Sequence, residues 1–451
     1  MDRFAVMAFS ILLCGALQAA PDVVLAITAA RLLDGVRSAA IPSSVVLIGA
    51  DGGIAAAGPA GEVAVPSGVR VIRAEGMTLL PGLIDGHVHL AWDKTLYTTF
   101  SAEDYKARHK RWNPDRALVR AGHHAQLALA AGVTTVRDCG ADDFTILALR
   151  DAINAGDFSG PRILASGRPV TTTAGHTYSG WGVDGITEVR EAIRHLAGER
   201  VDFIKMIVSG GTTTPGTNIS QSQYTLEEVR AAVQEAHRLG LQVAAHAIAT
   251  ESIRLAAEAG VDTIEHCSWI GRDPKTTVTD EVAVDFMVKN GVRVDHAIIP
   301  RAYMFPDESA APLTAEEDWW LKMLKIRWPF LHHMRKRGVT VFLATDAGFR
   351  PWPGTQNWPG FQELARAVEI VVRHGGFSPA DAIAMVTREP AKALRLDREV
   401  GTIESGKRAD LILVAGDPLQ DIRALRNVEM VFRDGRLVAQ QGHIVLPGSG
   451  R

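Results

Sequence analysis

The sequence predicts an α/β protein: a (β/α)8 TIM barrel with a small β-sandwich domain built from both chain ends. Two observations predict this fold. Between residues 79 and 399, apolar strand-like segments alternate with amphipathic helical segments. Before and after that region, short alternating strands are broken by Gly, Asp and Pro. We therefore expect residues 21–78 and 400–451 to form the β-sandwich and residues 79–399 to form the barrel.

Eight segments of the barrel region have the length and composition of buried strands. In order, they are TLLPGLIDGHVH, VTTVRDCG, RILASGRPV, DFIKMIVSGG, QVAAHAI, DTIEHCSW, RVDHAII and TVFLATDAG. Helical segments lie between them, such as YTLEEVRAAVQEAHRLG. That helix opens with Thr225 and Glu228 at capping-box spacing and ends at Gly240, a typical stop signal.

The first twenty residues have the layout of a secretory signal peptide. Arg3 precedes an apolar stretch over residues 4–17, and small residues follow at Ala19 and Ala20. The apolar stretch is short for a membrane-spanning helix, and no later segment is long and apolar enough to span a bilayer. We expect a signal peptide over residues 1–20 and a secreted or periplasmic protein; a buried helix and an uncleaved anchor are the alternatives.

Charge and cysteine content add two expectations. The net charge of −3 gives no reason to expect nucleic acid or an anionic membrane as a partner. Beyond the signal segment, Cys139 and Cys267 lie in apolar, strand-like segments. We expect two buried thiols, with a disulfide left open because the compartment is expected to be oxidising.

Polar residues recur where the predicted strands end. His87 and His89 are two residues apart, so they share one face of the first strand. The fourth, fifth, sixth and eighth strands carry Lys205, His246, His266 and Asp346. In a barrel of this type, the carboxyl ends of the strands build the active site. The sequence therefore predicts that these six side chains converge.

Neutral imidazoles and a carboxylate suit a divalent transition metal, with zinc the first expectation. An ammonium group at Lys205 would repel that metal, so we expect a neutral amine there. A neutral amine can add carbon dioxide and become a carbamate, whose two oxygens can bridge two metal ions.

The motifs GLIDGHVHL, DFIKMIVSGG, VAAHA, DTIEHC, ATDAG and GTIESGKRADLILV resemble those of the amidohydrolase superfamily. Within it, they are similar to the imidazolonepropionase-related branch that includes Xaa-Pro dipeptidases and ochratoxin-type amidases. The resemblance implies a first metal on His87, His89 and Asp346 and a second on His246 and His266, with carbamylated Lys205 bridging them. It also implies a homo-oligomer. Imidazolonepropionase itself uses one metal and lacks the lysine, which argues against that activity here.

Such a site is expected to hydrolyse amides. The metal-bridging water would become a hydroxide that attacks the carbonyl carbon, while Asp346 would shuttle its proton to the leaving nitrogen. Two divalent ions outweigh carbamate, Asp346 and hydroxide by one charge, so the site should favour an anionic substrate. We expect a dipeptidase, carboxypeptidase or N-acyl amino acid amidase acting beside a free carboxylate, including ochratoxin-type substrates.

Two other functions remain open. A lactonase or organophosphate esterase can use the same site, because loops decide function on this scaffold. The other alternative is a non-catalytic binding or assembly protein on an inactive barrel, against which the complete ligand set argues.

Further residues are candidates for substrate contact. His176 matches a histidine that the resemblance places near the substrate, although a plain loop histidine is the alternative. Tyr224 can bond the reacting carbonyl or fasten the next helix. Arg301 and Tyr303 follow the seventh strand and can hold a carboxylate. His296 is expected behind the ligands or in the pocket wall.

Several other residues are assigned by their position alone. Four histidines in helical stretches are expected to be structural: His123, His124, His332 and His333. Five tryptophans follow barrel strands: Trp92, Trp181, Trp269, Trp352 and Trp358. They predict a roomy apolar pocket, with Trp352 as a substrate contact, unless they only pack loops together.

Overall fold

The computed structural model describes residues 22–92, 112–212, 214–297, 315–348 and 360–446. The predicted signal peptide, Arg301, Tyr303, Trp352 and Trp358 lie outside these ranges. No helix within them is long and apolar enough to cross a membrane. Cys139 and Cys267 are free and buried, which confirms the expected thiols.

The eight strands of the barrel region are all present, and they pair in parallel in chain order. They are β5 (Leu83–Val88), β6 (Val133–Asp138), β7 (Arg162–Ala165), β8 (Phe203–Ile207), β9 (Gln242–Ala249), β10 (Thr263–Ile270), β11 (Arg293–Ala297) and β12 (Val341–Ala344). They form two sheets, β5-β6-β7 and β8 to β12; among the described residues, the isolated bridges Val170↔Met206 and Val88↔Ala347 connect them. Strand order and helix placement are thus those of a TIM-type barrel, although one continuous closed sheet is not detected among the described residues.

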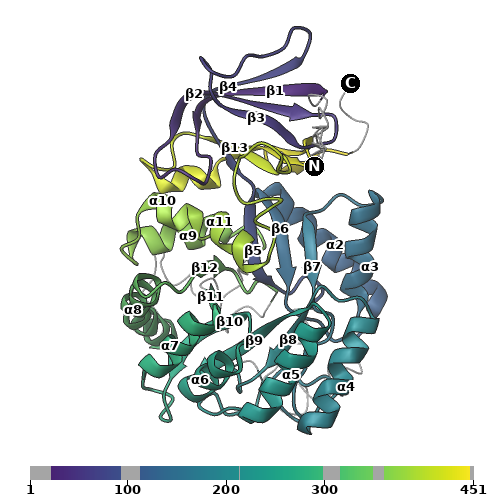
Figure 1. Ribbon diagram of the computed structural model, residues 1–451, viewed down its shortest axis with the longest axis vertical. Helices are drawn as coiled ribbons and strands as arrows, with labels where there is room; N and C mark the ends of the chain where they lie inside the picture. Colours follow the sequence, from purple (N-terminus) through teal and green to yellow (C-terminus); the bar gives the residue numbers. More distant parts are fainter. Residues whose placement is uncertain (1–21, 93–111, 213, 298–314, 349–359, 447–451) are drawn as a thin grey trace, which may run out of the picture.

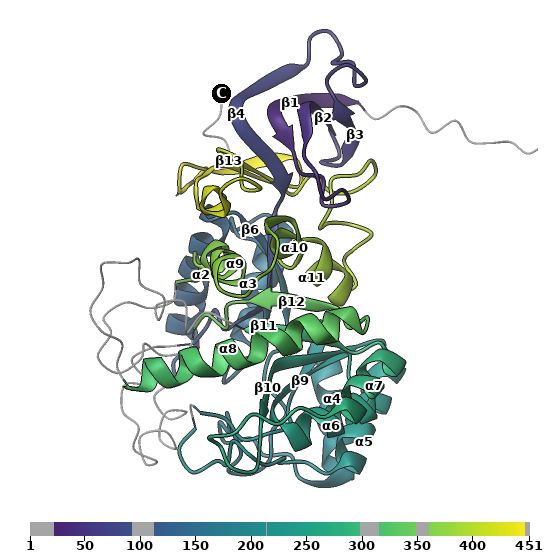
Figure 2. The same ribbon diagram turned by 90° about the vertical axis from the view of Figure 1, so that its left-hand side faces the viewer.

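Helices follow the strands and cover the sheets from outside (Figure 1). They are α2 (Pro114–Ala130), α3 (Thr145–Ala155), α4 (Gly185–Gly198), α5 (Leu226–Arg238), α6 (Thr250–Ala259), α7 (Glu281–Asn290), α8 (Ala315–Lys336), α9 (Leu364–Arg373), α10 (Pro379–Ala384) and α11 (Arg388–Ala393). The predicted capping box on α5 is confirmed, because Thr225 and Glu228 each bond the other's backbone N–H. Figure 2 shows α8 passing in front of β11 and β12.

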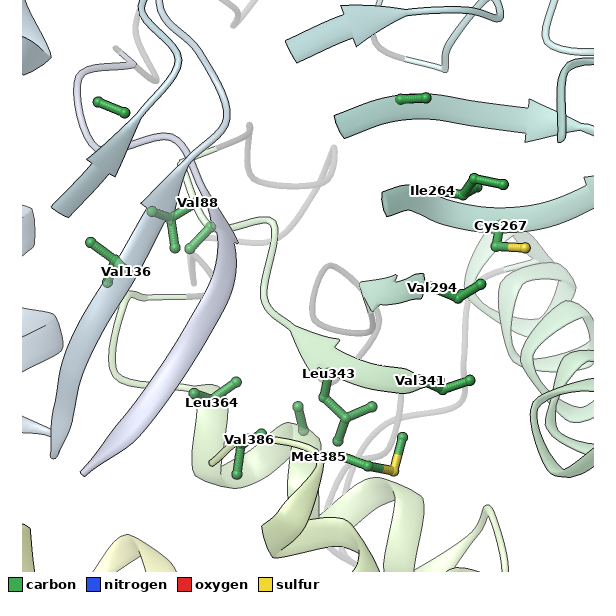
Figure 3. Packing of buried hydrophobic residues seen from close by; sticks show 14 of the residues in the cluster. Val88, Val136, Ile264, Cys267, Val294, Val341, Leu343, Leu364, Met385 and Val386 are labelled. Carbon is green, nitrogen blue, oxygen red and sulfur yellow. The ribbon is translucent and has the colours of Figure 1, made fainter. Parts of the chain in front are cut away.

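The strands alternate between a helix-facing side and an inner side. Ile264, Val294 and Val341 are register partners on β10, β11 and β12, and they belong to the large hydrophobic core (Figure 3). The next residue of each strand, Glu265, Asp295 and Phe342, points the opposite way and forms a second register row. Because Glu265 and Asp295 are fully buried, the inner side holds charged groups.

The two chain ends meet in one sheet at one end of the molecule, drawn in purple and yellow in Figures 1 and 2. Its order is β16-β15-β14-β13-β4-β1-β2-β3. The strands are β1 (Val23–Leu32), β2 (Ile41–Gly49), β3 (Ile54–Pro59), β4 (Arg70–Pro81), β13 (Leu411–Ala415), β14 (Val428–Arg433), β15 (Arg436–Gln440) and β16 (His443–Ile444), and a 3₁₀ helix, η3 (Ile422–Arg426), follows β13. Antiparallel pairing of β4 with β13 joins the two ends, as expected.

The β-sandwich itself is not confirmed, because all eight described terminal strands belong to a single hydrogen-bonded sheet. The alternation of apolar and polar residues along the strands is compatible with a sandwich and with one sheet that has two apolar faces. The sequence therefore does not distinguish these two arrangements. The domain limits at residues 78/79 and 399/400 stay predictions.

Candidate active site

The strand ends bring the six predicted side chains together. His87 lies on β5, Lys205 on β8, His246 on β9 and His266 on β10, while His89 directly follows β5 and Asp346 lies two residues beyond β12. The ring centroids of His87 lie 5.3 Å from His89 and 5.0 Å from His266, and those of His246 and His266 are 4.7 Å apart. Lys205 is only 2% exposed, and its Nζ lies 3.4 Å from Nε2 of His87.

His87, His89 and Asp346 form the tightest group, with ligand atoms all within 4.8 Å of one another. Oδ1 of Asp346 lies 3.4 Å from Nε2 of His87 and 3.3 Å from Nε2 of His89. The opposite nitrogens face acceptors: Nδ1 of His87 lies 2.7 Å from Oδ2 of Asp295, and Nδ1 of His89 lies 2.8 Å from the carbonyl oxygen of Gly140. The carbonyl oxygen of Gly140 can only accept, and Oε2 of Glu265, a carboxylate paired with Arg137, also lies 2.9 Å from Nδ1 of His87. Both rings therefore carry their proton on Nδ1.

With the protons on Nδ1, the lone pairs of this group are arranged in a way that favours a bound cation. Each Nε2 then presents a lone pair toward the same carboxylate oxygen, Oδ1 of Asp346. That oxygen is buried and has no hydrogen-bond donor among the described residues. Histidines that bind metals hold their second nitrogen in this way, with the N–H on a carboxylate or carbonyl. These residues therefore fit a divalent transition metal.

His246 is oriented in the opposite sense. Its Nε2 lies 3.2 Å from the carbonyl oxygen of Gly210, so that nitrogen carries the proton and Nδ1 is left as the ligand atom. Gly210 belongs to the loop after β8, and a side chain there would collide with the backbone of Asn218 at 2.1 Å. The glycine thus lets the loop approach closely enough to accept this hydrogen bond.

The backbone is unusual where two of the ligands sit. His266, Cys267 and Trp269 have φ values of 67°, 45° and 55°, and the pairing of β10 with β9 shifts register between His266 and Ile270. Asp346 has a φ of 52°. Non-glycine residues rarely adopt this conformation, and bulges near active sites re-aim side chains. The irregular backbone turns both ligands toward the cluster.

Burial and neighbouring charge set the protonation of the cluster. Burial, with help from Lys205, lowers the pKa of His87 to about 4. Burial also lowers the pKa of His246 and His266, and neighbouring cationic groups add to the effect. Burial alone would raise the pKa of Asp346, but His87, His89 and Lys205 hold it below its usual value. Near neutral pH the site therefore offers neutral imidazoles at His87, His246 and His266 and an ionised carboxylate at Asp346, the forms that bind metals.

A second group, His87, Cys139 and Glu265, also has ligand atoms within 4.8 Å. It suits a metal less well. Burial raises the pKa of the Cys139 thiol, which keeps it protonated. Nδ1 of His87 lies 2.9 Å from Oε2 of Glu265, so that nitrogen already has an acceptor.

His176 lies beside the cluster, with its ring centroid 4.7 Å from that of His246. Its Nδ1 is 2.7 Å from the hydroxyl oxygen of Thr214. A Cβ on Gly211 would stand 2.1 Å from Nε2 of His176, so the ring lies flat against that glycine. This position agrees with the predicted substrate contact, which stays a prediction.

Two other predicted contacts occupy structural positions. The hydroxyl of Tyr224 donates to the carbonyl oxygen of Val183 at 2.8 Å, and the side chain is buried, which favours the fastening role over bonding of the substrate. His296 pairs with Leu343 and alternates with Asp295, so the register puts it on the helix-facing side, away from the imidazoles. The register therefore does not support its predicted substrate contact.

The described tryptophans pack rather than line an open pocket. Trp92 stacks on the ring of His89, with centroids 4.6 Å apart, and is 2% exposed. Trp181 lies under the guanidinium of Arg168. Trp269 is 1% exposed. For these three residues the packing alternative holds.

Three of the four helical histidines have structural contacts, as expected, and the assignment of His123 stays a prediction. His124 bonds the carbonyl oxygen of Leu90, His332 bonds that of Gly375, and His333 pairs with Glu281. His123 lies beside His124 within α2.

Sequence reasoning missed four groups that hold the ligands, Glu265, Asp295, Gly140 and Gly210, and it gave Trp92 a place in the pocket wall rather than against His89. One signal was present. Acidic residues at Glu265 and Asp295 interrupt otherwise apolar strands, and a buried carboxylate needs a partner.

Comparison with known proteins identifies the family of the chain. Ochratoxinase from Aspergillus niger is 28% identical over 401 residues, covering 81% of this chain and 76% of that enzyme. Imidazolonepropionase from Mesorhizobium japonicum is 26% identical, covering 90% of this chain and 93% of that enzyme. The solved structure of a Xaa-Pro dipeptidase with methionine in its active site is 29% identical, with a TM-score of 0.75 over 92% of this chain and 99% of that chain. Residues 78–438 match the profile of the Amidohydrolase family, and the chain therefore belongs to this family of hydrolases.

Proposed function

We propose that the protein is an exported amidohydrolase with two divalent metal ions, which releases a carboxylate-bearing amino acid from an amide or peptide bond. The observation that carries the proposal is the pair of Nε2 lone pairs of His87 and His89 facing Oδ1 of Asp346 at 3.4 and 3.3 Å. A cation between these atoms would make that arrangement favourable, and Lys205 and the two other imidazoles, which lie beside it, offer ligands for a second ion.

Each group of the chain has a task in this account. When bound, zinc or a similar ion polarises the scissile carbonyl and acidifies water. Asp346, kept ionised, would accept the proton of the attacking water and pass it to the leaving nitrogen. Lys205, buried among the imidazoles, would help to hold the pair of metals as a carbamate. His176 bonds the substrate beside His246, from a ring held by Thr214 and Gly211.

The substrate class follows from charge and likeness. Two divalent ions leave the centre with excess positive charge, which attracts a carboxylate near the scissile bond. The similar Xaa-Pro dipeptidase is named for substrates that end in a free carboxylate, and the similar ochratoxinase for its own substrate. We therefore assign dipeptides and N-acyl amino acids to this site.

Turnover of an N-acyl amino acid and of its methyl ester tests the substrate class. The free acid should have a kcat/KM about 100-fold higher, because the ester lacks the charge that the site attracts. Equal rates would rule out recognition of the carboxylate. The Asp346→Asn variant, assayed beside the native protein, shows whether turnover belongs to this site.

A substrate panel separates the amidase from its rivals. Xaa-Pro dipeptides and N-acyl amino acids should be hydrolysed, and lactones and paraoxon much more slowly. The reverse preference would favour the lactonase or esterase alternative. Activity lost with a chelator and regained with zinc would dismiss the non-catalytic alternative. Detecting the protein without residues 1–20 in the exported fraction would support export.

A further inference from the structure

An arginine lies buried on the inner side of the strands, beneath the metal cluster. Arg137 of β6 is 3% exposed. Its Nε donates to the carbonyl oxygen of Gly86 at 2.6 Å, and Nη1 donates to Oγ1 of Thr263 at 3.0 Å. Nη2 lies 2.8 and 2.9 Å from the two carboxylate oxygens of Glu265. The guanidinium thus ties β5, β6 and β10 together.

The same carboxylate reaches a metal-site histidine. Oε2 of Glu265 lies 2.9 Å from Nδ1 of His87, and Oδ2 of Asp295 lies 2.7 Å from that nitrogen. Nδ1 therefore faces two buried carboxyl groups. Glu265 is held by Arg137 and by the hydroxyl of Thr263, which donates to its Oε1 at 2.6 Å. A continuous chain of contacts runs from Arg137 through Glu265 to His87.

The shape of the arginine matters as well as its charge. The planar guanidinium uses separate nitrogens for Gly86, Thr263 and Glu265. The rings of Phe203 and Phe342 flank it, with centroids 5.2 and 5.8 Å from Cζ. A lysine ammonium has neither the fork nor the flat faces needed for these contacts.

We propose that Arg137 is a positioning residue for the metal site: by fixing Glu265, it keeps the proton of His87 on Nδ1 and directs Nε2 toward the first metal. This inference rests on the proposed metal centre. Without Arg137, the carboxylate of Glu265 would lose the partner that fixes its position, and His87 would lose a fixed acceptor. Ring orientation and tautomer are what partners behind a metal ligand control.

The test compares Arg137→Met with Arg150→Met. Arg150, on α3, is also buried and paired, with Nη1 2.9 Å from Asp202 and 2.8 Å from the carbonyl oxygen of Arg200. Its hydrogen bonds and ion pairs within the described ranges involve no residue of the cluster. The full chain is stripped of metal, and ¹⁵N NMR reports the tautomer of His87. Zinc is then titrated against a competing chelator.

For Arg137→Met we expect mixed tautomers of His87 and a roughly 10- to 100-fold weaker affinity for the more labile zinc ion. Arg150→Met should leave both unchanged, even where it lowers thermal stability. A folded Arg137→Met protein with the native tautomer and native zinc affinity would overturn the proposal.

Thr263→Val provides a milder variant if Arg137→Met does not fold. It removes the hydroxyl that contacts both Arg137 and Glu265, at nearly constant volume. A several-fold loss of zinc affinity is expected, and an unchanged affinity contradicts the proposal. Native protein that binds no zinc would contradict the proposed metal centre. The tautomer of His87, measured in metal-free protein, would still test the positioning role of Arg137.

Discussion

The two halves of the polar cluster are held by different kinds of contact. On the half built by β5 and β12, side chains contact both rings: two carboxyl groups reach His87, and Trp92 stacks on His89, whose Nδ1 also bonds the backbone carbonyl oxygen of Gly140. On the half built by β9 and β10, His246 depends on the carbonyl oxygen of Gly210, and His266 on a bulged strand. The first half should therefore respond mainly to side-chain changes, and the second half to changes in the backbone of its loop and strand.

The largest effect is expected for Asp346→Asn on the first half. The amide neither pairs with a cation nor accepts the proton, so kcat/KM should fall by about a thousand-fold. Steady-state kinetics with metal analysis checks this. Because His246 and His266 are untouched, the second metal should be retained. An Asp346→Asn variant that stays within about ten-fold of the native rate would contradict a catalytic role.

Gly211→Ala tests the loop that serves the second half. The added Cβ would stand 2.1 Å from Nε2 of His176 and push that ring aside. We expect kcat/KM to fall by roughly 10- to 100-fold through misplacement of His176, with metal content unchanged. Gly198→Ala is the matched control, because a Cβ there meets no atom within 4 Å. Equal behaviour of the two variants would remove His176 from the site.

Trp92→Leu tests the first half more gently. Losing the stack on His89 should weaken zinc binding by about several-fold, since the ring gains freedom to turn. Trp181→Leu, which removes a tryptophan packed on Arg168, should leave zinc binding unchanged. Chelator competition measures both. Equal losses would mean that loop packing in general, and not the contact with His89, matters.

The smallest effect is expected for Tyr224→Phe, which touches neither half. Removing the hydroxyl deletes the bond to Val183 and should cost about 1 kcal/mol in the free energy of unfolding. Its kcat/KM should stay unchanged. Denaturant unfolding and kinetics check this together; a kcat lowered more than about ten-fold would restore Tyr224 as a contact of the reacting carbonyl.

The positions of the ligands could be predicted from the sequence, but the contacts that orient them could not. The six cluster residues were predictable because the ends of parallel strands meet, so His87, His246 and Asp346 had to lie together once each strand was recognised. The contacts behind them were not. Which carboxylate reaches Nδ1 of His87 depends on the register of β10 and β11, and a bulge at His266 leaves no clear periodic signal.

The terminal strands show the same limit. The alternation of apolar and polar residues predicted the terminal strands and their polar turns, but one sheet and a sandwich produce similar patterns. Trp92, Trp181 and Trp269 were expected to line a pocket, and they pack against neighbours instead. A position after a strand places a residue at the active-site end of the barrel, but it does not show whether the side chain faces an opening or a neighbour.

The central claim is that the six side chains form a centre for two metal ions, and elemental analysis of freshly purified, active protein tests it most directly. The account predicts two transition-metal ions per native chain and one per chain of Asp346→Asn. Active native protein that carries no transition metal would contradict it.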